Sequence, residues 1–288
     1  MGLTCNPDIR ERLQTVSQLI PQHREIGRFL ELERDVLGVQ LEIESGQRET
    51  FLDRLTQTSL EELAQESSRT KTPMSILIDA EVFDSSSLRS PFTKVLNILV
   101  EKDIGGDDSR KLLRAMQTGQ ISLTRLIEAT LREGEARLEE YAAVLGVQPA
   151  LLSYALGAIV RPFFEELARK IDPSFYDGWW NARCPICGRT PSVAKIRQRK
   201  RYLVCTFCGA EYLSDHFVCV HCGNTDPSTL KYLSDENDQR SRIDFCTRCT
   251  GYLKVLDEYS GDAVPKGFED ILTLSLDLVA VSKGLKRS

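Results

Sequence analysis

Apolar residues recur at helical spacing through most of positions 6–170. Near the start they return every three or four residues, which is the pattern of one buried face on an α-helix. The members of this first stripe are Ile9, Leu13, Val16, Leu19 and Ile20. Asn6 followed by Pro7 is typical of a helix cap and a first helical position. The pattern therefore predicts a helix that begins at Pro7.

The same spacing predicts a bundle of further helices. The second is expected over about 22–44, with Gly46 as its end. Ser59 opens a sequence typical of a helix start, and the apolar run 74–78 predicts a short segment lying on the core. The later helices are expected over 91–102, 107–117, 122–132, 134–145 and 148–170. The last of them is the most apolar, so we expect it at the centre of the bundle.

Polar residues mark some of these helix starts. Asp107, Asp108 and Ser122 are suitable N-cap residues because their side chains can accept a hydrogen bond from the first turn. Trp179 and Trp180 lie in the connector that follows the last of these helices. We expect this connector to pack the helical part onto the rest of the chain, with a partner-binding surface as the alternative.

Beyond residue 190 the helical period disappears and short β-type runs replace it. They are separated by Gly, Asn and Asp. These runs are 202–204, 217–218, 230–233, 243–245 and 252–256. A final helix is predicted over 267–282. Its apolar face consists of Phe268, Ile271, Leu272, Leu278 and Val279.

Eight of the nine cysteines form four CxxC pairs in this β-rich part. The pairs are Cys184 and Cys187, Cys205 and Cys208, Cys219 and Cys222, and Cys246 and Cys249. Two intervening residues let both thiolates of a pair face one ion, and a tetrahedral site takes two pairs. We expect sequential pairing of the four CxxC motifs; an interleaved cross-brace is the alternative. Both zinc and iron accept four sulfur ligands, and two saturated sites would be structural.

Turn residues after the pairs support a metal-binding interpretation over a redox one. Gly188, Gly209 and Gly223 each follow a second cysteine, where the chain must turn sharply. Thr250 stands at that position in the fourth pair. A thioredoxin-like redox pair would sit in a βαβ pattern, which is not visible here. His216, His221 and His23 are interpreted as non-ligands, because eight cysteines complete two sites, and Cys5 as a free thiol.

These patterns define an α+β fold class. The prediction is an N-terminal all-α helical domain over 1–177, a first rubredoxin-like or zinc-ribbon module over 178–215, and a second over 216–288 that includes a C-terminal helix. The net charge is −5. Residues 1–177 are acidic overall and the remainder is slightly basic.

The basic run 195–201 lies between the two halves of the first site, so we expect it at a hairpin tip. The simplest interpretation is a solvated β-arm; an acidic protein or nucleic acid is the alternative partner. The acidic overall charge argues against nucleic acid as the ligand. Known catalytic motifs are missing, and so is any apolar run long enough for a membrane span or a secretory signal. We therefore expect a non-enzymatic cytoplasmic protein that does not span a membrane.

The cysteine motifs and their flanks resemble the formate dehydrogenase accessory protein family known as FdhE. The similar segments are CPICGRTPSVAKI, RYLVCTFCGAEY, CVHCG and CTRCTGYLKVLDE, followed by the helix FEDILTLSLDLVAVSKG. The resemblance covers about 178–282. The N-terminal helical part agrees with that of the family in its length and in being all-helical.

The resemblance implies a helical domain followed by two rubredoxin-like modules, with iron in both sites and the eight paired cysteines as ligands. It also implies a cytosolic, non-catalytic factor. Its protein partner would be the catalytic subunit of a respiratory formate dehydrogenase, a molybdenum or tungsten enzyme, before export through the twin-arginine pathway. A nucleic-acid-associated zinc-ribbon protein and a redox-active iron protein are the alternative functions. The sequence leaves the oligomeric state open.

Overall fold

The computed structural model describes residues 5–55, 60–133, 135–179, 181–235, 238–258 and 264–287. The chain forms two compact units. The helical unit contains Asp8–Leu63 and Ser75–Leu167, and the sheet unit contains Met1–Pro7, Ala64–Met74 and Ala168–Ser288. Both cysteine modules thus lie in the sheet unit, and the domain boundaries at 177 and 215 stay a prediction. The predicted α+β class is confirmed.

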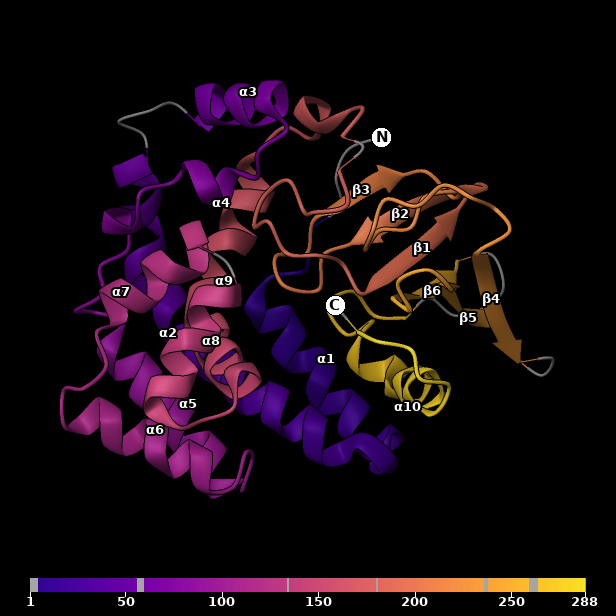
Figure 1. The fold of residues 1–288 in the computed structure, drawn as a ribbon. Coiled ribbons are helices and arrows are strands. Elements are labelled where there is room, and N and C mark those ends of the chain that lie inside the picture. Colours follow the sequence, from indigo (N-terminus) through magenta and orange to yellow (C-terminus); the bar gives the residue numbers. More distant parts are fainter. Residues whose placement is uncertain are drawn as a thin grey trace. The chain divides into compact units, whose positions relative to one another are not determined.

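The helices follow the predicted order closely (Figure 1). Their bounds are α1 Ile9–Gln22, α2 Gly27–Leu55, α3 Leu60–Thr70, α4 Met74–Leu77, α5 Arg89–Glu101, α6 Asp107–Gln117, α7 Leu123–Glu128, α8 Glu135–Leu145 and α9 Pro149–Lys170. Short 3-10 turns lie at Arg24–Ile26, Ala80–Val82 and Pro173–Tyr176, and α7 continues as a π-helical turn over Ala129–Glu133.

Three details of the helix ends differ from the prediction. The N-cap of α1 is Asp8 and not Asn6, because the Asp8 carboxylate accepts a hydrogen bond from the backbone N–H of Glu11 at 2.8 Å. Helix α2 continues through Gly46 to Leu55. One glycine costs a helix only about 1 kcal/mol, and burial of Phe51 and Leu55 beyond it outweighs that cost.

The third difference concerns α6, whose N-cap is Gly106 without a side-chain hydrogen bond. Asp108 instead accepts the backbone N–H of Gln148 at 2.9 Å, so its carboxylate ties two segments of the helical unit together. The predicted cap at Ser122 is confirmed, since its hydroxyl accepts the Arg125 amide at 3.5 Å. The predicted cap residue Ser59 lies outside the described residues.

The core of the helical unit combines aromatic rings with a buried ion pair. Phe51, Phe83 and Phe163 lie with ring centroids 5.0 to 5.3 Å apart. Arg12 of α1 bonds Glu165 of α9 at 2.5 Å, and both side chains are 1% exposed. Helix α9 therefore contributes apolar and charged core contacts, as expected for a central helix.

Within the described ranges, no single helix has the length and apolarity needed to cross a bilayer. The segments Arg137–Leu145 and Pro149–Lys170 pass that test only as a pair, which is bent by 111°.

The sheet unit contains one six-stranded sheet with the order β3-β2-β1-β6-β5-β4. The strands are β1 Val193–Arg197, β2 Lys200–Val204, β3 Glu211–Ser214, β4 Leu230–Asp235, β5 Asp238–Cys246 and β6 Tyr252–Asp257. Each cysteine module contributes three consecutive antiparallel strands. Parallel pairing of β1 with β6 joins the two halves, so the modules share a sheet.

Two predicted elements of this unit need correction. Residues 217–218 are not a strand: Phe217 donates its N–H to Asp215, and Arg201 donates to the Val218 carbonyl, so side chains satisfy this backbone. The C-terminal helix is shorter than expected. A 3-10 turn over Ile271–Thr273 precedes α10 Leu274–Ser282.

The apolar face predicted for the last helix is also wrong in part. Phe268 is buried, but Leu278 and Val279 are exposed, and α10 instead buries Ala280. Ala280 packs with Ile243 of β5 and Tyr252 of β6. Burial of the preceding turn sets this orientation, since the Glu269 and Asp270 carboxylates bond to lysines of the sheet.

Candidate metal centres

The four CxxC pairs form four knuckles with the same backbone hydrogen bonds. In the first knuckle, the Gly188 amide donates to the Cys184 carbonyl at 3.0 Å, and the Cys184 amide donates to the Arg189 carbonyl at 2.9 Å. The equivalent pairs of bonds in the other three knuckles measure 2.8 to 3.0 Å. Such a turn directs both thiols of a pair to one side, as a shared ion requires.

The residue after the second cysteine has positive φ in every knuckle. Gly188, Gly209 and Gly223 have φ of 75°, 75° and 70°, and Thr250 has 60°. Glycine adopts this region without strain, which explains the first three positions. The fourth knuckle therefore turns at the same position as the other three, although the β-branched residue Thr250 occupies that position.

The first cluster consists of Cys184, Cys187, Cys205 and Cys208, whose sulfur atoms all lie within 4.8 Å of one another. The Cys184 and Cys208 sulfurs are 3.4 Å apart, and those of Cys187 and Cys205 are 3.3 Å apart. A disulfide requires about 2.05 Å, so these are free thiols. Burial raises the pKa of Cys184 and Cys208 well above the usual range.

The second cluster consists of Cys219, Cys222, Cys246 and Cys249. Its Cys219–Cys249 and Cys222–Cys246 sulfur distances are 3.7 and 3.9 Å. Four sulfurs bound tetrahedrally at about 2.3 Å from an ion are about 3.8 Å apart. The second cluster therefore has the dimensions of a four-sulfur site, and the first is slightly tighter.

Ionisation of the second cluster is uneven. Burial raises the pKa of Cys219 to about 12. Burial also opposes ionisation of Cys246, but backbone N–H groups of Cys249 and Arg248 outweigh it and lower that pKa to about 7. A bound cation would supply the positive charge that four adjacent thiolates need.

The two clusters differ in exposure. All four cysteines of the first cluster are nine-tenths or more buried. In the second cluster Cys222 is exposed and Cys249 is half-buried. Both clusters use sequentially adjacent knuckles, as the spacing predicted, and neither is interleaved. Two four-cysteine groups that could each hold a metal ion are thus present.

The histidines near the third knuckle lie outside both clusters. His221 bonds the Tyr252 carbonyl through Nε2 at 2.8 Å, and His216 bonds the Arg199 carbonyl at 3.0 Å. The His221 ring also covers Gly251, where a Cβ atom would come within 2.5 Å of the ring. His221 therefore supports the fourth knuckle by packing. Cys5 is half-buried, and its thiol bonds the Ala168 carbonyl at 3.1 Å.

The basic run 195–201 is solvated only at its tip, where Gln198, Arg199 and Lys200 are exposed, whereas Lys195 and Arg201 at its ends are buried. It does form a hairpin between β1 and β2. Lys195 is 2% exposed and bonds Glu211 at 3.1 Å and Glu269 at 2.8 Å. Arg197 bonds Glu258 at 2.5 Å and Glu211 at 3.1 Å. Strand alternation puts Lys195 and Arg197 of β1 on one face, where Glu211 and Glu258 lie.

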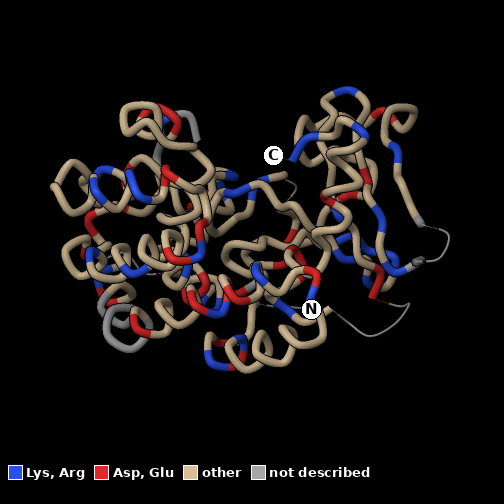
Figure 2. The backbone as a smooth tube through the Cα atoms, turned by 90° about the horizontal axis from the view of Figure 1, so that it is seen from below, with Lys and Arg blue, Asp and Glu red and all other residues tan. Residues whose placement is uncertain are grey.

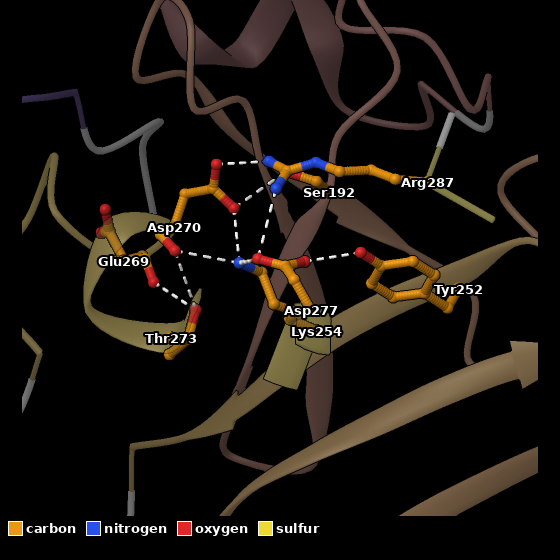
Figure 3. Close-up of polar contacts among 8 residues, drawn as sticks. All are labelled: Ser192, Tyr252, Lys254, Glu269, Asp270, Thr273, Asp277 and Arg287. Atoms are coloured by element: carbon orange, nitrogen blue, oxygen red, sulfur yellow. Dashed lines mark hydrogen bonds and ion pairs between the residues drawn. The ribbon is translucent and has the colours of Figure 1, made fainter. Parts of the chain in front are cut away.

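A second buried lysine fixes the C-terminal segment on the sheet (Figure 3). Lys254 of β6 is fully buried and bonds Asp270 at 2.6 Å and Asp277 at 2.8 Å. Arg287 bonds the same two carboxylates, and the Tyr252 hydroxyl donates to Asp277 at 2.6 Å. Sequence reasoning missed this cluster. The sequence feature that could have revealed it is Lys254, a lysine inside the otherwise apolar run 252–256.

The tryptophan of the connector that the structure describes, Trp179, is a packing residue. It is 1% exposed, meets Tyr176 edge-on at 5.5 Å and donates its indole N–H to the Arg183 carbonyl at 2.8 Å. Trp180 lies outside the described residues. Trp179 thus contributes to the core of the sheet unit next to the first knuckle.

These features define a class of protein: an α+β chain in which two four-cysteine ribbon modules share a sheet and a helical unit accompanies them. Curated proteins named FdhE homolog are similar to this chain. The chain is 32% identical over 145 residues to a protein named FdhE homolog from Aquifex aeolicus, covering 48% of this chain and 50% of that protein. It is 37% identical over 113 residues to an FdhE homolog from Stutzerimonas stutzeri, covering 36% and 35%.

The chain therefore spans half or less of the length of the curated relatives it matches. A crystal structure of the FdhE protein from Pseudomonas aeruginosa matches the fold with a TM-score of 0.61 at 20% identity, covering 100% of this chain and 96% of that one. No family model matches the chain. These findings support the FdhE family, and the resemblance found in the sequence is confirmed.

Proposed function

We propose that this chain is a non-catalytic accessory factor that binds the catalytic subunit of a respiratory formate dehydrogenase in the cytoplasm and is needed for its activity before export. The FdhE name of its curated relatives supports the accessory role. The main structural observation in favour is the pair of clusters, each with four cysteine thiols within 4.8 Å of one another.

We infer that each cluster holds one ion, iron or zinc, through its four cysteines. Four thiolates suit either metal. When bound, such an ion supplies a positive charge and a rigid cross-link between two knuckles. With all four positions taken by sulfur there is no place for a substrate, so the ions fit a structural role. The protein's own contribution is a rigid surface.

The nucleic-acid alternative is weakened, because Arg199 and Lys200 are the exposed cations of the basic run 195–201. Lys195 and Arg197 bond carboxylates of the sheet unit, and Arg201 is 3% exposed. Figure 2 shows Lys and Arg interspersed with Asp and Glu along the chain. A phosphate backbone would need several available cations.

Gene deletion in the native host tests the proposal. Formate oxidation by the respiratory enzyme should fall to background in the deletion strain and return with the wild-type gene. Complementation with Cys184→Ser or Cys219→Ser should fail, while Cys5→Ser, which touches neither cluster, should restore activity. Unchanged formate oxidation in a deletion host with a single respiratory formate dehydrogenase would contradict the proposal.

A further inference from the structure

A cavity of about 400 Å³ lies on the second cysteine module. One wall is the sheet, with Leu230 and Tyr232 of β4 and Leu253 of β6. The other wall is the loop after β3, which carries Phe217 and Val218. This volume falls in the range of ligand-binding pockets and is large enough for a few side chains. The loop that was wrongly predicted as a strand therefore encloses a binding-sized space.

The cavity opens on the sheet face opposite to α10. Ile243 points to the α10 side, where it packs with Ala280, so its neighbours Arg242 and Asp244 on β5 point to the other side. At this opposite face Phe217 and Tyr232 are each 66% exposed. Two exposed aromatic rings beside an apolar cavity are typical of a surface that binds a protein segment.

The polar groups that line the cavity indicate the chemistry of its ligand more narrowly than the shape of the cavity does. Arg201 lines it and is 3% exposed. Its guanidinium donates to the Ser214 hydroxyl and the Val218 carbonyl, both at 3.0 Å, which are neutral acceptors. Over the residues that the structure describes, its Nε has no hydrogen-bond partner. The carboxylates of Asp244 and Asp215 favour its charge from a distance but form no ion pair with it.

Other buried cations of the sheet unit are paired differently. Lys195 has Glu269 at 2.8 Å and Lys254 has Asp277 at 2.8 Å. Arg201 differs from these two lysines, because it forms no ion pair with a carboxylate among the described residues. A buried charge without such a partner is unfavourable. The desolvated environment lowers the pKa of Arg201, in contrast to that of Lys195, which is raised despite burial because Glu269 and Glu211 lie beside it.

Further charged residues line the cavity, together with Cys219 and Cys246 of the second cluster. Lys231 and Arg242 lie in its wall, and Asp244 is the acidic residue there. Asp244 already bonds Arg242 at 2.7 Å. His221 also lines the cavity, and its buried Nδ1 finds no partner among the described residues. The cavity therefore offers apolar walls together with two buried polar groups, on Arg201 and His221, that lack a hydrogen-bond partner among the described residues.

We propose that this cavity binds a short segment of a partner protein in which an acidic side chain stands next to an apolar one. The apolar side chain occupies the space between Phe217, Tyr232 and Leu253, and the carboxylate pairs with Arg201. The inference rests on the proposed function only in that it takes the occupant to be a protein. Binding of this segment would place a carboxylate in direct contact with Arg201, which forms no ion pair among the described residues.

A displayed library of eight-residue peptides tests the proposal without assuming the partner. The full-length protein with both metal sites loaded is the bait. Selected peptides should contain Asp or Glu beside Leu, Phe, Ile or Met. A synthetic peptide of the enriched sequence, measured by fluorescence anisotropy, should bind at least about tenfold more tightly than its copy with Gln for Glu or Asn for Asp.

Variants locate the site. Phe217→Ser combined with Tyr232→Ser should weaken peptide binding at least about tenfold, because both rings are exposed and contribute little to folding. Leu278→Ser on α10 is the matched control, since Leu278 is 74% exposed but lies away from the cavity. Arg201→Gln should remove the preference for the acidic peptide over its amide copy, provided metal content is unchanged.

Four outcomes would overturn the proposal: no enrichment, enrichment without acidic residues, equal binding by the double aromatic variant, or displacement of the peptide by acetate at the peptide's own concentration. The last would indicate a site for small carboxylates. Failure of the formate dehydrogenase proposal would be seen separately, because peptide binding is measured with purified protein and needs no particular partner.

Discussion

At the residue scale, Thr250 and the three knuckle glycines show how strongly the turn is constrained. Thr250 adopts φ of 60° although a β-branched residue is disfavoured there. Its carbonyl accepts the Lys286 amide at 2.9 Å, so the C-terminal segment holds this turn in place. Gly209 has a second constraint, because a Cβ atom at that position would lie 2.5 Å from the Asn6 side chain.

Substitution of two glycines separates these constraints. Gly223→Ala meets only the backbone strain, since a Cβ atom there contacts nothing within 4 Å. It should lower the free energy of unfolding by about 1 kcal/mol. Gly209→Ala should lower it by about 1–3 kcal/mol more through the clash with Asn6. Urea denaturation of both variants in the metal-loaded state measures the difference, and equal losses would contradict the close approach.

The Asp270 carboxylate gives a prediction about pH. Burial opposes its ionisation, but Lys254 and Arg287 outweigh burial and hold its pKa below the usual range. A lowered folded-state pKa stabilises the fold above the ordinary Asp pKa of about 4, and this stabilisation is lost as pH falls through the folded value. Asp270→Asn should therefore cost about 3 kcal/mol at pH 7 and less at pH 3.

Denaturation of wild type and Asp270→Asn at both pH values measures this difference. Comparing the two proteins at each pH cancels the loss of metal in acid, which affects both. Asp215→Asn is the control, because Asp215 is exposed and remote from Lys254. A difference between wild type and Asp270→Asn that is the same at pH 7 and pH 3 would contradict the assigned pKa direction.

At the element scale, most helices could be predicted because their apolar period is long and regular. Helix α6 matches its predicted range, and α5, α8 and α9 differ by one or two residues at an end. The end of α2 could not be predicted, since burial of Phe51 beyond Gly46 is a tertiary effect. The start of α10 was also missed, because Lys195 and Lys254 bond the residues before it.

The knuckles were the most predictable elements of the candidate site. Their spacing gave the eight cysteines and the sequential pairing because a CxxC turn is a local structure. The buried lysines could not be found in this way. Lys195 belongs to a run that is basic in sequence, and only strand alternation together with Glu211 and Glu269 places it inside.

At the scale of the whole molecule, the two cysteine modules are halves of one sheet. Pairing of β1 with β6 joins them, and the Lys195 network connects β1, β3 and the segment before α10. The modules were predicted as separate domains, and the parallel pairing is a contact between residues about 60 positions apart that local patterns cannot reveal. The clusters nevertheless differ, since only the second has an exposed cysteine.

This difference predicts an order of metal loss. A thiol-competing chelator should remove one ion per chain in a fast phase from the second cluster, where Cys222 is exposed, and one in a slow phase from the buried first cluster. Cys222→Ser should remove the fast phase, and Cys187→Ser should remove the slow one. Stopped-flow absorbance of the chelator measures both phases. Loss of the slow phase in Cys222→Ser would contradict the assignment.

The central claim is that the eight paired cysteines hold two ions, and metal analysis combined with X-ray absorption tests it most directly. Anaerobically purified protein should contain two ions of iron or zinc per chain, each with four sulfur neighbours at about 2.3 Å. Each cluster should account for one ion, so Cys205→Ser should reduce the content to one. Fewer than two ions in the wild-type protein, or a shell with nitrogen or oxygen ligands, would contradict the account.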